Sequence, residues 1–418
     1  MSIKNRFFRR ISVQSSRKNS TVPVFLNVLM TDVRPASVQQ KLMSFYALID
    51  RCLSDRRRVN LVVVVGVRGE ESARRVYSSH LGRYLKDEYF NLVLIRPGFG
   101  SFYRVWAVFY AVIYFFKLRG GLALRINFAC LSALSRVRIK VFQYIYDALP
   151  CSHWLGFTGG VELPAFRFRR DHSAIESSVS ALQFGQASLE QQHFSGYSVD
   201  NFFVYDDLSR RIYQKLNMQV RNMVVTGSPE FEYHTSLLCN EKLFDEDKLN
   251  VLFVDQPVQQ RGEYSKEYLQ ACYAMLDELN SESDVNLKVK LHPRGSAFSQ
   301  AQLSSFSVVD DWSACLSSSH VVIGFFSNLC DLALRSGRVT FYLGSVSILD
   351  QAKQGWVASQ GGYVIDDIDS AKQMIKRLKS QCVHLAKQIM LRAAMEPELP
   401  SELIYQRMVV CSESKAVA

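Results

Sequence analysis

The chain has 418 residues, and its length predicts two domains of roughly 200 residues each. Hydrophobic residues make up 48% of the chain, charged residues make up 21%, and there are only 10 prolines, which excludes a disordered, collagenous or low-complexity protein. Residues 1–150 carry 25 Lys or Arg against 8 Asp or Glu, whereas the remaining 268 have a net charge of −6. A basic half of this kind suits an anionic partner, such as a membrane surface, a polyanionic substrate or nucleic acid.

The cysteines and the N-terminal residues indicate the cellular compartment in which the protein works. The nine cysteines are scattered and none are spaced as Cys-x-x-Cys, which argues against a disulfide framework, a zinc site or a thioredoxin-like motif. Residues 1–20 contain six basic residues and no acidic one, and no small-residue cleavage site follows the β-rich run 21–29. We therefore predict a basic cytoplasmic tail and not a signal peptide.

The longest apolar stretch is 105–116, within the segment 103–118, and Arg104, Lys117 and Arg119 flank it. It is shorter than the roughly 20 residues that a membrane-spanning helix needs. Two interpretations remain open: a buried helix, or an aromatic helix that lies in a membrane interface.

Short β-branched or aromatic runs alternate with amphipathic segments through the whole chain, which is the pattern of parallel α/β sheets. In the first half, helices are predicted at 38–51 and 71–86, and a long, basic, mostly helical stretch is predicted at 101–147. The predicted strands of this half are 24–30, 60–67, 91–96, 153–158, 181–185, 201–205 and 222–226.

The segment 237–248 is the most charged connector in the middle of the chain, and the alternation restarts after it. Strands are then predicted at 249–255, 286–291, 321–325, 339–343 and 363–365, and helices at 265–279, 312–318, 328–336 and 371–395. We predict two doubly wound, Rossmann-like α/β domains that face one another across a cleft. Their expected bounds are 21–240 and 249–395, with the tail 1–20 before them and a second tail at 396–418.

Ligands of open parallel sheets bind beyond the carboxyl ends of the strands, so residues at strand ends carry most weight. The predicted strand 286–291 leads into His292, Pro293 and Arg294, with Lys290 just before its end. Arg can neutralise a phosphate with two hydrogen bonds, and His can donate a proton to the phosphate as it leaves. The alternative is that this His-Pro dipeptide has a structural role only.

A second candidate follows the apolar strand 321–325, which contains Gly324 and runs into Ser327 and Asn328. These two residues look like the N-cap of a helix, where free backbone N–H groups and a hydroxyl can bind an anion without a metal. Capping alone is the alternative interpretation for Ser327, and the two roles are compatible.

The order of these motifs resembles a known family. An apolar strand with Lys-x-His-Pro-Arg, then strand-Gly-Phe-x-Ser-helix, then Gly-x-Val-x-x-Tyr at 337–342 resembles the C-terminal domain of bacterial surface-polysaccharide glycosyltransferases with the two-domain GT-B fold. Within that group the chain is most similar to the capsule and lipooligosaccharide sialyltransferases and polysialyltransferases. The CDP-glycerol polymerising transferases share the layout, and the run 251–257 resembles the start of these enzymes' nucleotide-binding domain. The resemblance covers residues 179–345.

This resemblance implies roles for several donor-side residues. It implies that His292 is the general acid that binds the departing CMP phosphate and that Ser327 is a phosphate-binding hydroxyl. Asn328 stands where a second hydroxyl is often found, which is a departure from the CMP-sialic acid pattern. We also expect donor contacts from the other polar or close-approach residues at these strand ends, namely Lys290, Arg294, Asp255, Gln256 and Gly324.

The candidate general base lies in the first half. Glu162 follows a predicted strand and the Gly159-Gly160 turn, where an acceptor hydroxyl would lie and lose its proton in an inverting transfer. A surface or helix-start role is the alternative for Glu162, and Asp32 is the second candidate base. The acidic pair Asp206-Asp207 is expected to cap the helix 208–216.

Other phosphate-binding and metal-binding motifs are missing. The sequence has no Gly-x-x-x-x-Gly-Lys-[Ser/Thr] loop, its first strand is not followed by Gly-x-Gly-x-x-Gly, and no Asp-x-Asp stands at a strand end. We therefore expect a metal-independent reaction with no cofactor beyond the nucleotide-sugar co-substrate.

Three classes of function remain. The first is a cytoplasmic glycosyltransferase, peripheral to an anionic inner membrane, that extends a glycan or lipid-linked glycan. The second is a nucleotide-sugar epimerase of the same fold, which would need an Asp-Ser-Gly-Gly helix start that residues 326–328 do not offer. The third is a basic scaffold or nucleic-acid-binding protein. The aromatic residues of the basic half cluster in an apolar run instead of among Lys and Arg, so no nucleic-acid partner is expected.

Overall fold

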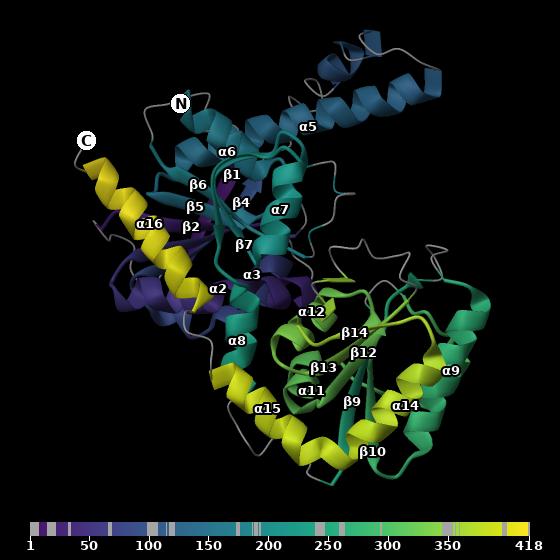
Figure 1. The fold of residues 1–418 in the computed structure, drawn as a ribbon. Coiled ribbons are helices and arrows are strands. Elements are labelled where there is room, and N and C mark those ends of the chain that lie inside the picture. The colour runs from purple at the N-terminus through teal and green to yellow at the C-terminus, as the bar shows by residue number, and fades with distance from the viewer. Residues whose placement is uncertain are drawn as a thin grey trace. The chain divides into compact units, whose positions relative to one another are not determined.

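The computed structural model divides the chain into two compact units, which are described separately below (Figure 1). The N-domain comprises the chain up to residue 230 together with the segment from residue 399 onward, and the C-domain comprises residues 231–398. The structure describes residues 8–14, 22–31, 35–65, 69–97, 108–113, 115–116, 122–172, 176–185, 187, 191, 194–238, 247–258, 264–292, 295–344, 354–355, 357–358, 360–394 and 399–416.

An eight-stranded sheet forms the centre of the N-domain, in the order β1-β4-β3-β2-β5-β6-β7-β8. All pairs are parallel except β1 with β4. The chain starts the parallel part at β2, adds β3 and β4 on one side and then continues with β5 on the other, so the order reverses between β2 and β5. The strands are β1 (Phe8–Gln14), β2 (Val24–Met30), β3 (Arg58–Val64), β4 (Phe90–Pro97), β5 (His153–Phe157), β6 (Ser178–Leu182), β7 (Ser198–Val204) and β8 (Gln219–Val225).

Strand β1 corrects the prediction that residues 1–20 form a tail. It pairs with β4 with Ile11 opposite Ile95 and Val13 opposite Val93. The prediction rested on the basic charge of the segment and overlooked the β-branched residues at alternate positions, which favour a strand.

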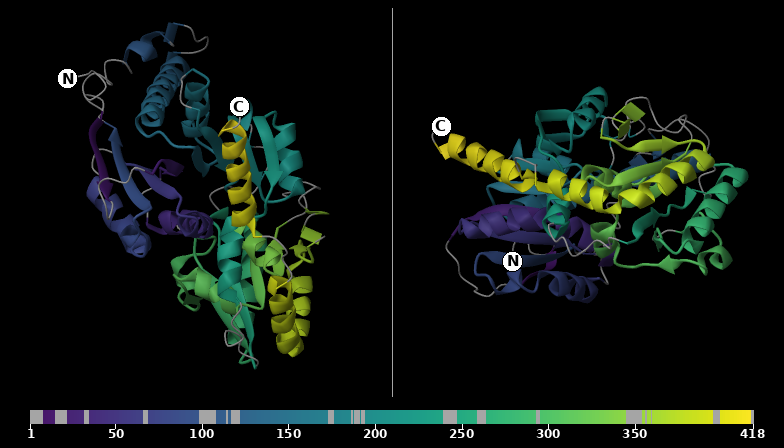
Figure 2. Two further views of the ribbon diagram at one scale, coloured as in Figure 1. Left: turned by 90° about the vertical axis from the view of Figure 1, so that its left-hand side faces the viewer. Right: turned by 60° about the horizontal axis from the view of Figure 1, so that its bottom comes forward.

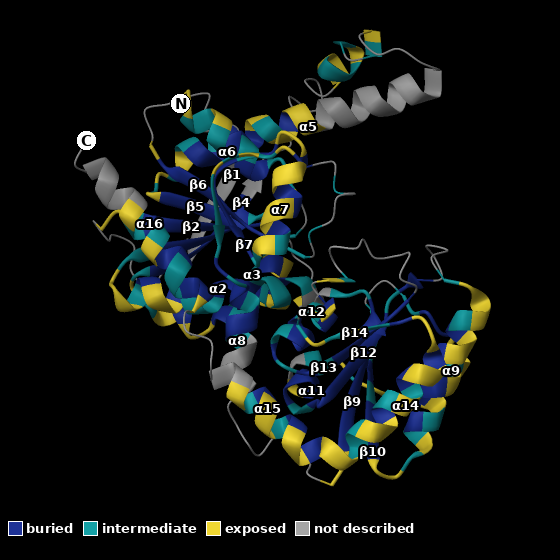
Figure 3. Cartoon of the chain, viewed as in Figure 1, coloured by how far each residue is buried: buried dark blue, intermediate teal, exposed yellow. Residues whose placement is uncertain are grey.

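Helices cover both faces of this sheet, and each face has its own hydrophobic core. One core joins α2 and α3 to strand residues such as Val28, and the other joins α5, α6 and α7 to residues of the opposite pleat such as Leu29. Figure 3 shows the buried strands between partly exposed helices. The helices are α2 (Pro35–Ser54), α3 (Glu70–Leu81), η1 (Tyr84–Lys86), α5 (Leu122–Ala148), α6 (Glu162–Arg170), α7 (Asp207–Lys215), α8 (Pro229–Leu238), which crosses the boundary into the C-domain, and α16 (Pro400–Ala416).

Helix α16 corrects the prediction of a C-terminal tail at 396–418. Ile404 and Met408 are fully buried in the core that α2 and α3 also contribute to, and the Tyr405 ring packs at a tilt of 59° to Phe25, with ring centroids 6.1 Å apart. An ion pair of 3.0 Å joins Glu402 to Arg51 of α2. The apolar residues of this segment therefore form the inner face of a helix that belongs to the N-domain.

The basic stretch predicted as mostly helical is helical wherever it is described. Residues 108–113 and 115–116 are helical, and α5 follows them (Figures 1 and 2). The C-terminal part of α5 lies in the core through Val137, Val141 and Ile145. Within the described part of the chain, no helix is long and apolar enough to cross a membrane.

The C-domain has a six-stranded parallel sheet in the order β11-β10-β9-β12-β13-β14. Its order also reverses, between β9 and β12, so both domains are doubly wound as predicted. Its strands are β9 (Leu249–Val254), β10 (Val285–Lys290), β11 (Ser307–Val308), β12 (Val321–Phe325), β13 (Val339–Leu343) and β14 (Tyr363–Ile365). Its helices are α9 (Lys266–Ser281), α10 (Gln300–Leu303), α11 (Trp312–Ser318), α12 (Asn328–Arg335), α14 (Ile368–Leu378), η5 (Lys379–Gln381) and α15 (Cys382–Ala394), so the helix predicted at 371–395 is divided by η5.

Buried asparagines fix the register of the central strands. Asn27, Asn60 and Asn91 lie opposite one another on β2, β3 and β4. Asn60 donates to Asn27 over 2.9 Å, and Asn91 donates to Asn60 over 2.8 Å. Asn286 and Asn250 make the equivalent bond of 2.9 Å between β10 and β9. A one-residue slip would leave these amides buried without partners, so the ladders specify the pairing.

Candidate functional site

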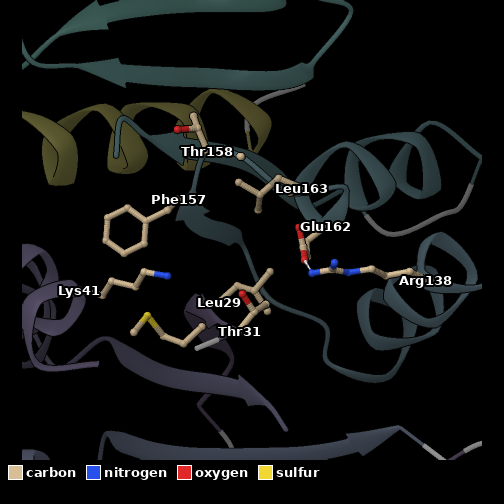
Figure 4. A pocket seen from close by; sticks show the side chains of 11 residues that line it. Leu29, Thr31, Lys41, Arg138, Phe157, Thr158, Glu162 and Leu163 are labelled. Atoms are coloured by element: carbon tan, nitrogen blue, oxygen red, sulfur yellow. Dashed lines mark hydrogen bonds and ion pairs between the residues drawn. The ribbon is translucent and has the colours of Figure 1, made fainter. Parts of the chain in front are cut away.

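A cavity of about 210 Å³ opens at the carboxyl ends of β2 and β5 in the N-domain. These two strands flank the point where the strand order reverses, which is where open α/β sheets bind ligands. Figure 4 shows side chains from α2, α5 and α6 around the same space. The lining residues are Leu29, Met30, Thr31, Lys41, Arg138, Phe157, Thr158, Gly159, Gly160, Glu162 and Leu163.

The predicted base Glu162 is the first residue of α6 and lines this cavity. Its side chain is only 8% exposed, and Oε1 accepts a hydrogen bond from the Arg138 guanidinium of α5 (Figure 4). Arg138 is 55% exposed, so the pair consists of a buried carboxylate and a cation at the rim. The ion pair holds the carboxylate in one orientation at the positive end of a helix, where a negative group is stabilised.

The two glycines of the turn before Glu162 are required for different physical reasons. Gly159 has φ +112°, a conformation that other residues rarely adopt, and open space surrounds its α-carbon. Gly160 instead lies beneath the Glu162 carboxylate, and a Cβ there would stand 2.5 Å from the carboxyl carbon. The predicted acceptor-side residues Gly159 and Gly160 therefore shape the turn that positions Glu162.

Lys41, Thr31 and Thr158 complete the polar lining. The Lys41 ammonium lies 5.9 Å from the centre of the Phe157 ring and 5.2 Å from that of Phe184. Thr158 Oγ1 is buried and has no hydrogen-bond partner within the described part of the chain. Buried hydroxyls are normally hydrogen-bonded, so Thr158 offers a polar group to a water or ligand in the cavity.

Four donor-side predictions gather at the carboxyl edge of the C-domain sheet. Asp255 and Gln256 follow β9, His292 follows β10, and Ser327 follows β12. Because β10, β9 and β12 are adjacent, these residues lie at and beside the point where this strand order reverses.

Asp255 organises the loop after His292. It is 1% exposed, and its Oδ1 accepts hydrogen bonds from the backbone of Gln256 at 2.8 Å and of Ala297 at 3.1 Å. Burial raises the pKa of Asp255, and hydrogen bonds from Ser296 and Ala297 partly offset that rise. The His292 carbonyl accepts from the Gly295 N–H at 3.1 Å, which closes the turn. Asp255 therefore acts on the loop and through it on His292.

Ser327 caps α12 as its sequence indicated. Its hydroxyl oxygen accepts from the Leu329 N–H at 3.2 Å, and its carbonyl accepts from Cys330 at 3.0 Å. The hydroxyl proton stays available for a ligand anion. The backbone of Asn328 begins the helix, and its side chain lies outside the described residues.

Two other donor-side predictions have a local structural explanation. A Cβ on Gly324 would stand 2.8 Å from both Cys330 Sγ and the Val254 carbonyl oxygen, so Gly324 allows α12 and β9 to pack closely. The Lys290 ammonium donates to the Leu291 carbonyl at 3.1 Å. Arg294 and the second candidate base Asp32 lie outside the described residues.

Sequence reasoning missed Lys41, Arg138, Thr31 and Thr158. Arg138 precedes Glu162 by 24 residues on a different helix, so no local pattern joins the two. Thr31 and Thr158 directly follow β2 and β5, and the rule that ligands bind at strand ends would have identified both.

Solved structures of nucleotide-sugar enzymes have a similar fold. The UDP-GlcNAc 2-epimerase from Neisseria meningitidis, bound to UDP-GlcNAc, matches with a TM-score of 0.54 and 10% identity over 92% of this chain and 100% of its own. The glycosyltransferase of kitacinnamycin matches with a TM-score of 0.52 and 12% identity over 92% and 99%. The α,α-trehalose 6-phosphate synthase from Burkholderia multivorans matches with a TM-score of 0.52 and 9% identity over 94% and 98%.

No protein-family model matches the chain, and no curated protein matches it in sequence. The likeness to solved structures shows the fold: two parallel-sheet α/β domains, as in GT-B glycosyltransferases and UDP-GlcNAc 2-epimerases.

Proposed function

We propose that the protein is a glycosyltransferase that uses a nucleotide-activated sugar to extend a bacterial surface glycan by metal-independent, inverting transfer. The observation that carries this proposal is that each of the two sheets has polar residues at the strand ends where its strand order reverses. In the N-domain this is a carboxylate, Glu162, beside a cavity, and in the C-domain these are His292 and the helix-capping Ser327. The first suits activation of a hydroxyl, and the second suits a phosphate.

The C-domain edge is the proposed donor site. The free N–H groups at the start of α12 and the Ser327 hydroxyl proton would bind the nucleotide phosphate. His292 would donate a proton to that phosphate as the bond from the anomeric carbon to the phosphate oxygen breaks and the nucleotide leaves with the electron pair. A CMP-linked sugar, CMP-sialic acid or a relative, is the donor that the motif resemblance favours.

The N-domain cavity is the proposed acceptor site. Glu162 Oε1 is bound to Arg138, so Oε2 is the oxygen that would take the proton of an acceptor hydroxyl while the hydroxyl oxygen attacks the anomeric carbon. Lys41 adds a positive charge beside the Arg138–Glu162 ion pair, so these three residues leave the cavity with a net positive charge, which favours an acceptor that carries a carboxylate or a phosphate. We propose a glycan or lipid-linked glycan acceptor at the cytoplasmic face of an anionic inner membrane.

A nucleotide-sugar epimerase is the second candidate, because structures of this class match the whole chain as well as those of transferases do. The two functions differ in one requirement. An epimerase converts its nucleotide sugar without an acceptor, whereas a transferase releases the nucleotide rapidly only when an acceptor is present.

The test measures thermal stabilisation of the full chain by CMP, CDP, UDP and GDP, followed by ¹H NMR of the matching nucleotide sugar with and without glycan acceptors. We expect stabilisation by one nucleotide, which His292→Ala removes and His384→Ala, an exposed histidine of α15, preserves. Glu162→Gln should retain this stabilisation and lose transfer, whereas the exposed control Glu71→Gln should retain both.

Two outcomes would overturn the transferase. Isomerisation of the nucleotide sugar without an acceptor would assign the epimerase. No stabilisation by any nucleotide, together with salt-sensitive binding of RNA or DNA, would assign a basic nucleic-acid-binding protein.

A further inference from the structure

Exposed apolar side chains gather on one short helical segment of the N-domain. Val108 is 63% exposed, Phe109 53%, Val112 50% and Phe116 75%, whereas the other described side chains of residues 108–116 are half-buried. At about 100° per residue, these four positions fall within an arc of about 100°. They form one stripe on the helix, which we name the apolar stripe.

The stripe lies beyond the N-terminal end of α5, in the blue part of the ribbon in Figures 1 and 2. In Figure 3 the same segment carries exposed surface. Exposed Phe and Val residues that share one face of a helix are a feature of interaction sites, whereas scattered exposed apolar residues are ordinary. The stripe therefore has the features of a docking surface.

The charge around the stripe identifies its partner. Residues 89–146 contain eight Lys or Arg and no Asp or Glu. A protein partner, or a second copy of this chain, would have to supply acidic groups to match this charge, and the N-terminal 150 residues of a second copy have their own excess of 17 positive charges. An anionic bilayer offers both an apolar layer for the stripe and negative headgroups for the basic residues.

We propose that the apolar stripe docks the N-domain onto the surface of an anionic lipid bilayer. Val108, Val112 and Phe116 enter the boundary between headgroups and acyl chains, and the net positive charge of this part of the sequence attracts it to the anionic headgroups. The stripe shares no residue with the cavity or with the donor-side residues. The docking rests on the membrane location in the proposed function and assigns it to a surface, and the vesicle test can fail while the nucleotide and transfer tests succeed.

The test is co-sedimentation of the full chain with vesicles of phosphatidylcholine alone or of phosphatidylcholine mixed with phosphatidylglycerol, an anionic lipid that gives the vesicle a negative surface potential. We expect binding to the anionic vesicles that weakens as salt rises. The double variant Val112→Ser/Phe116→Ser should weaken it by at least about 10-fold, because each side chain loses apolar burial. The control Phe168→Ser replaces a 55% exposed phenylalanine of α6 and should bind as the original does.

Size-exclusion chromatography with light scattering completes the test. Equal vesicle binding by the original chain and the double variant would overturn the proposal, and so would equal binding to neutral and anionic vesicles. If the original chain is a dimer that the double variant converts to a monomer, and neither binds vesicles, the stripe is an interface between copies. Both variants should keep the far-ultraviolet circular dichroism of the original, since the substituted side chains are exposed.

Discussion

The Glu162 carboxylate lies directly over the α-carbon of Gly160, closer than any side chain at residue 160 would permit. The neighbouring Gly159 has a positive φ and open space around it. Two adjacent glycines of one turn are thus required for different reasons, one for space and one for conformation.

Gly160→Ala should displace the carboxylate and reduce turnover of the nucleotide sugar by about 100-fold or more, because small misplacements of a reacting group are costly. Nucleotide stabilisation, which we assign to the proposed donor site of the C-domain, should not change. Gly82→Ala is the matched control, since Gly82 has a negative φ of −50° and a Cβ there would meet only the Ser78 carbonyl oxygen, at 3.8 Å. Equal turnover in Gly160→Ala and the original would show that the position of Glu162 is not used in catalysis.

Arg138→Leu should leave Glu162 without the cation that orients it and lower turnover by about 10- to 100-fold, the range for lost positioning of a reacting group. Arg138→Lys should recover part of the loss, because an ammonium keeps the charge but not the geometry of the guanidinium. The exposed Arg211→Leu of α7 is the control. Steady-state kinetics check this expectation, and a change confined to thermal stability would mean that Arg138 has a structural role only.

Asn60→Ala should lower the free energy of unfolding by about 1–3 kcal/mol, because it removes both the donor to the buried Asn27 Oδ1 and the acceptor of the buried Asn91 amide N–H. Asn222→Ala removes a separate bond of 3.1 Å, from half-buried Asn222 on edge strand β8 to Asn201 on β7, and should lower the free energy less. Urea unfolding followed by circular dichroism measures both. Equal losses would show that burial of the amides does not determine the contribution of the ladder.

Arg338 is a fully buried guanidinium whose three nitrogens donate to the carbonyls of Leu316, Ser317 and Ser336. Arg338→Met should destabilise the C-domain by at least about 2 kcal/mol, since these carbonyls would lose their partners. The exposed Arg377→Met of α14 should have almost no effect. Thermal unfolding of the two variants measures the difference. If Arg338→Met unfolds at the same temperature as the original, water replaces the guanidinium as the partner of these carbonyls.

The carboxylate of Glu278 on α9 pairs with Lys372 at 2.7 Å and Lys376 at 2.8 Å on α14. The hydrogen bond from Lys372, with that from Lys376, lowers the pKa of Glu278 to about 2. A lowered pKa in the folded state contributes stability above the unfolded value of about 4.3 and loses it as the pH falls toward 2. The urea midpoint of Glu278→Gln should therefore be below that of the original at pH 7, and the difference should shrink between about pH 5 and pH 3. Asp277→Asn, an exposed change on the same helix, is the control; a difference that does not vary with pH would contradict the assignment.

The sequence predicted the sheets well because their strands are buried on both faces. β2, β9 and β12 are nearly continuous apolar runs bounded by polar or turn residues, so their ends and their polar neighbours could be located from the sequence. β1 was missed because it is a basic edge strand whose alternation is short. The interpretation of Asp206 as a helix cap is confirmed, since its carboxylate accepts from the Ser209 N–H at 2.7 Å.

The site was harder to predict than the fold. Glu162 could be found because it follows a strand and two glycines, whereas Arg138 and Lys41 reach the cavity from the middle of helices. The position of a residue in the middle of a helix depends on how the helix packs on the sheet, and that packing cannot be predicted from a single sequence. Local patterns indicate residues at element ends, so they found the turn and missed the cations around it.

The return of α16 makes the C-domain an insertion within the N-domain. The chain leaves the N-domain at residue 230 and comes back at residue 399, so the C-domain is tethered at both of its ends. A fragment that stops before residue 399 would strip Ile404 and Met408 from a core to which they belong. The smallest self-sufficient N-domain is therefore discontinuous: residues 1–230 joined by a short linker to 399–418. Separation of the two domains therefore takes two cuts, one near the start of α8 and one before residue 399, and a single cut at either point would detach α16 from the N-domain core or leave it attached to the C-domain alone.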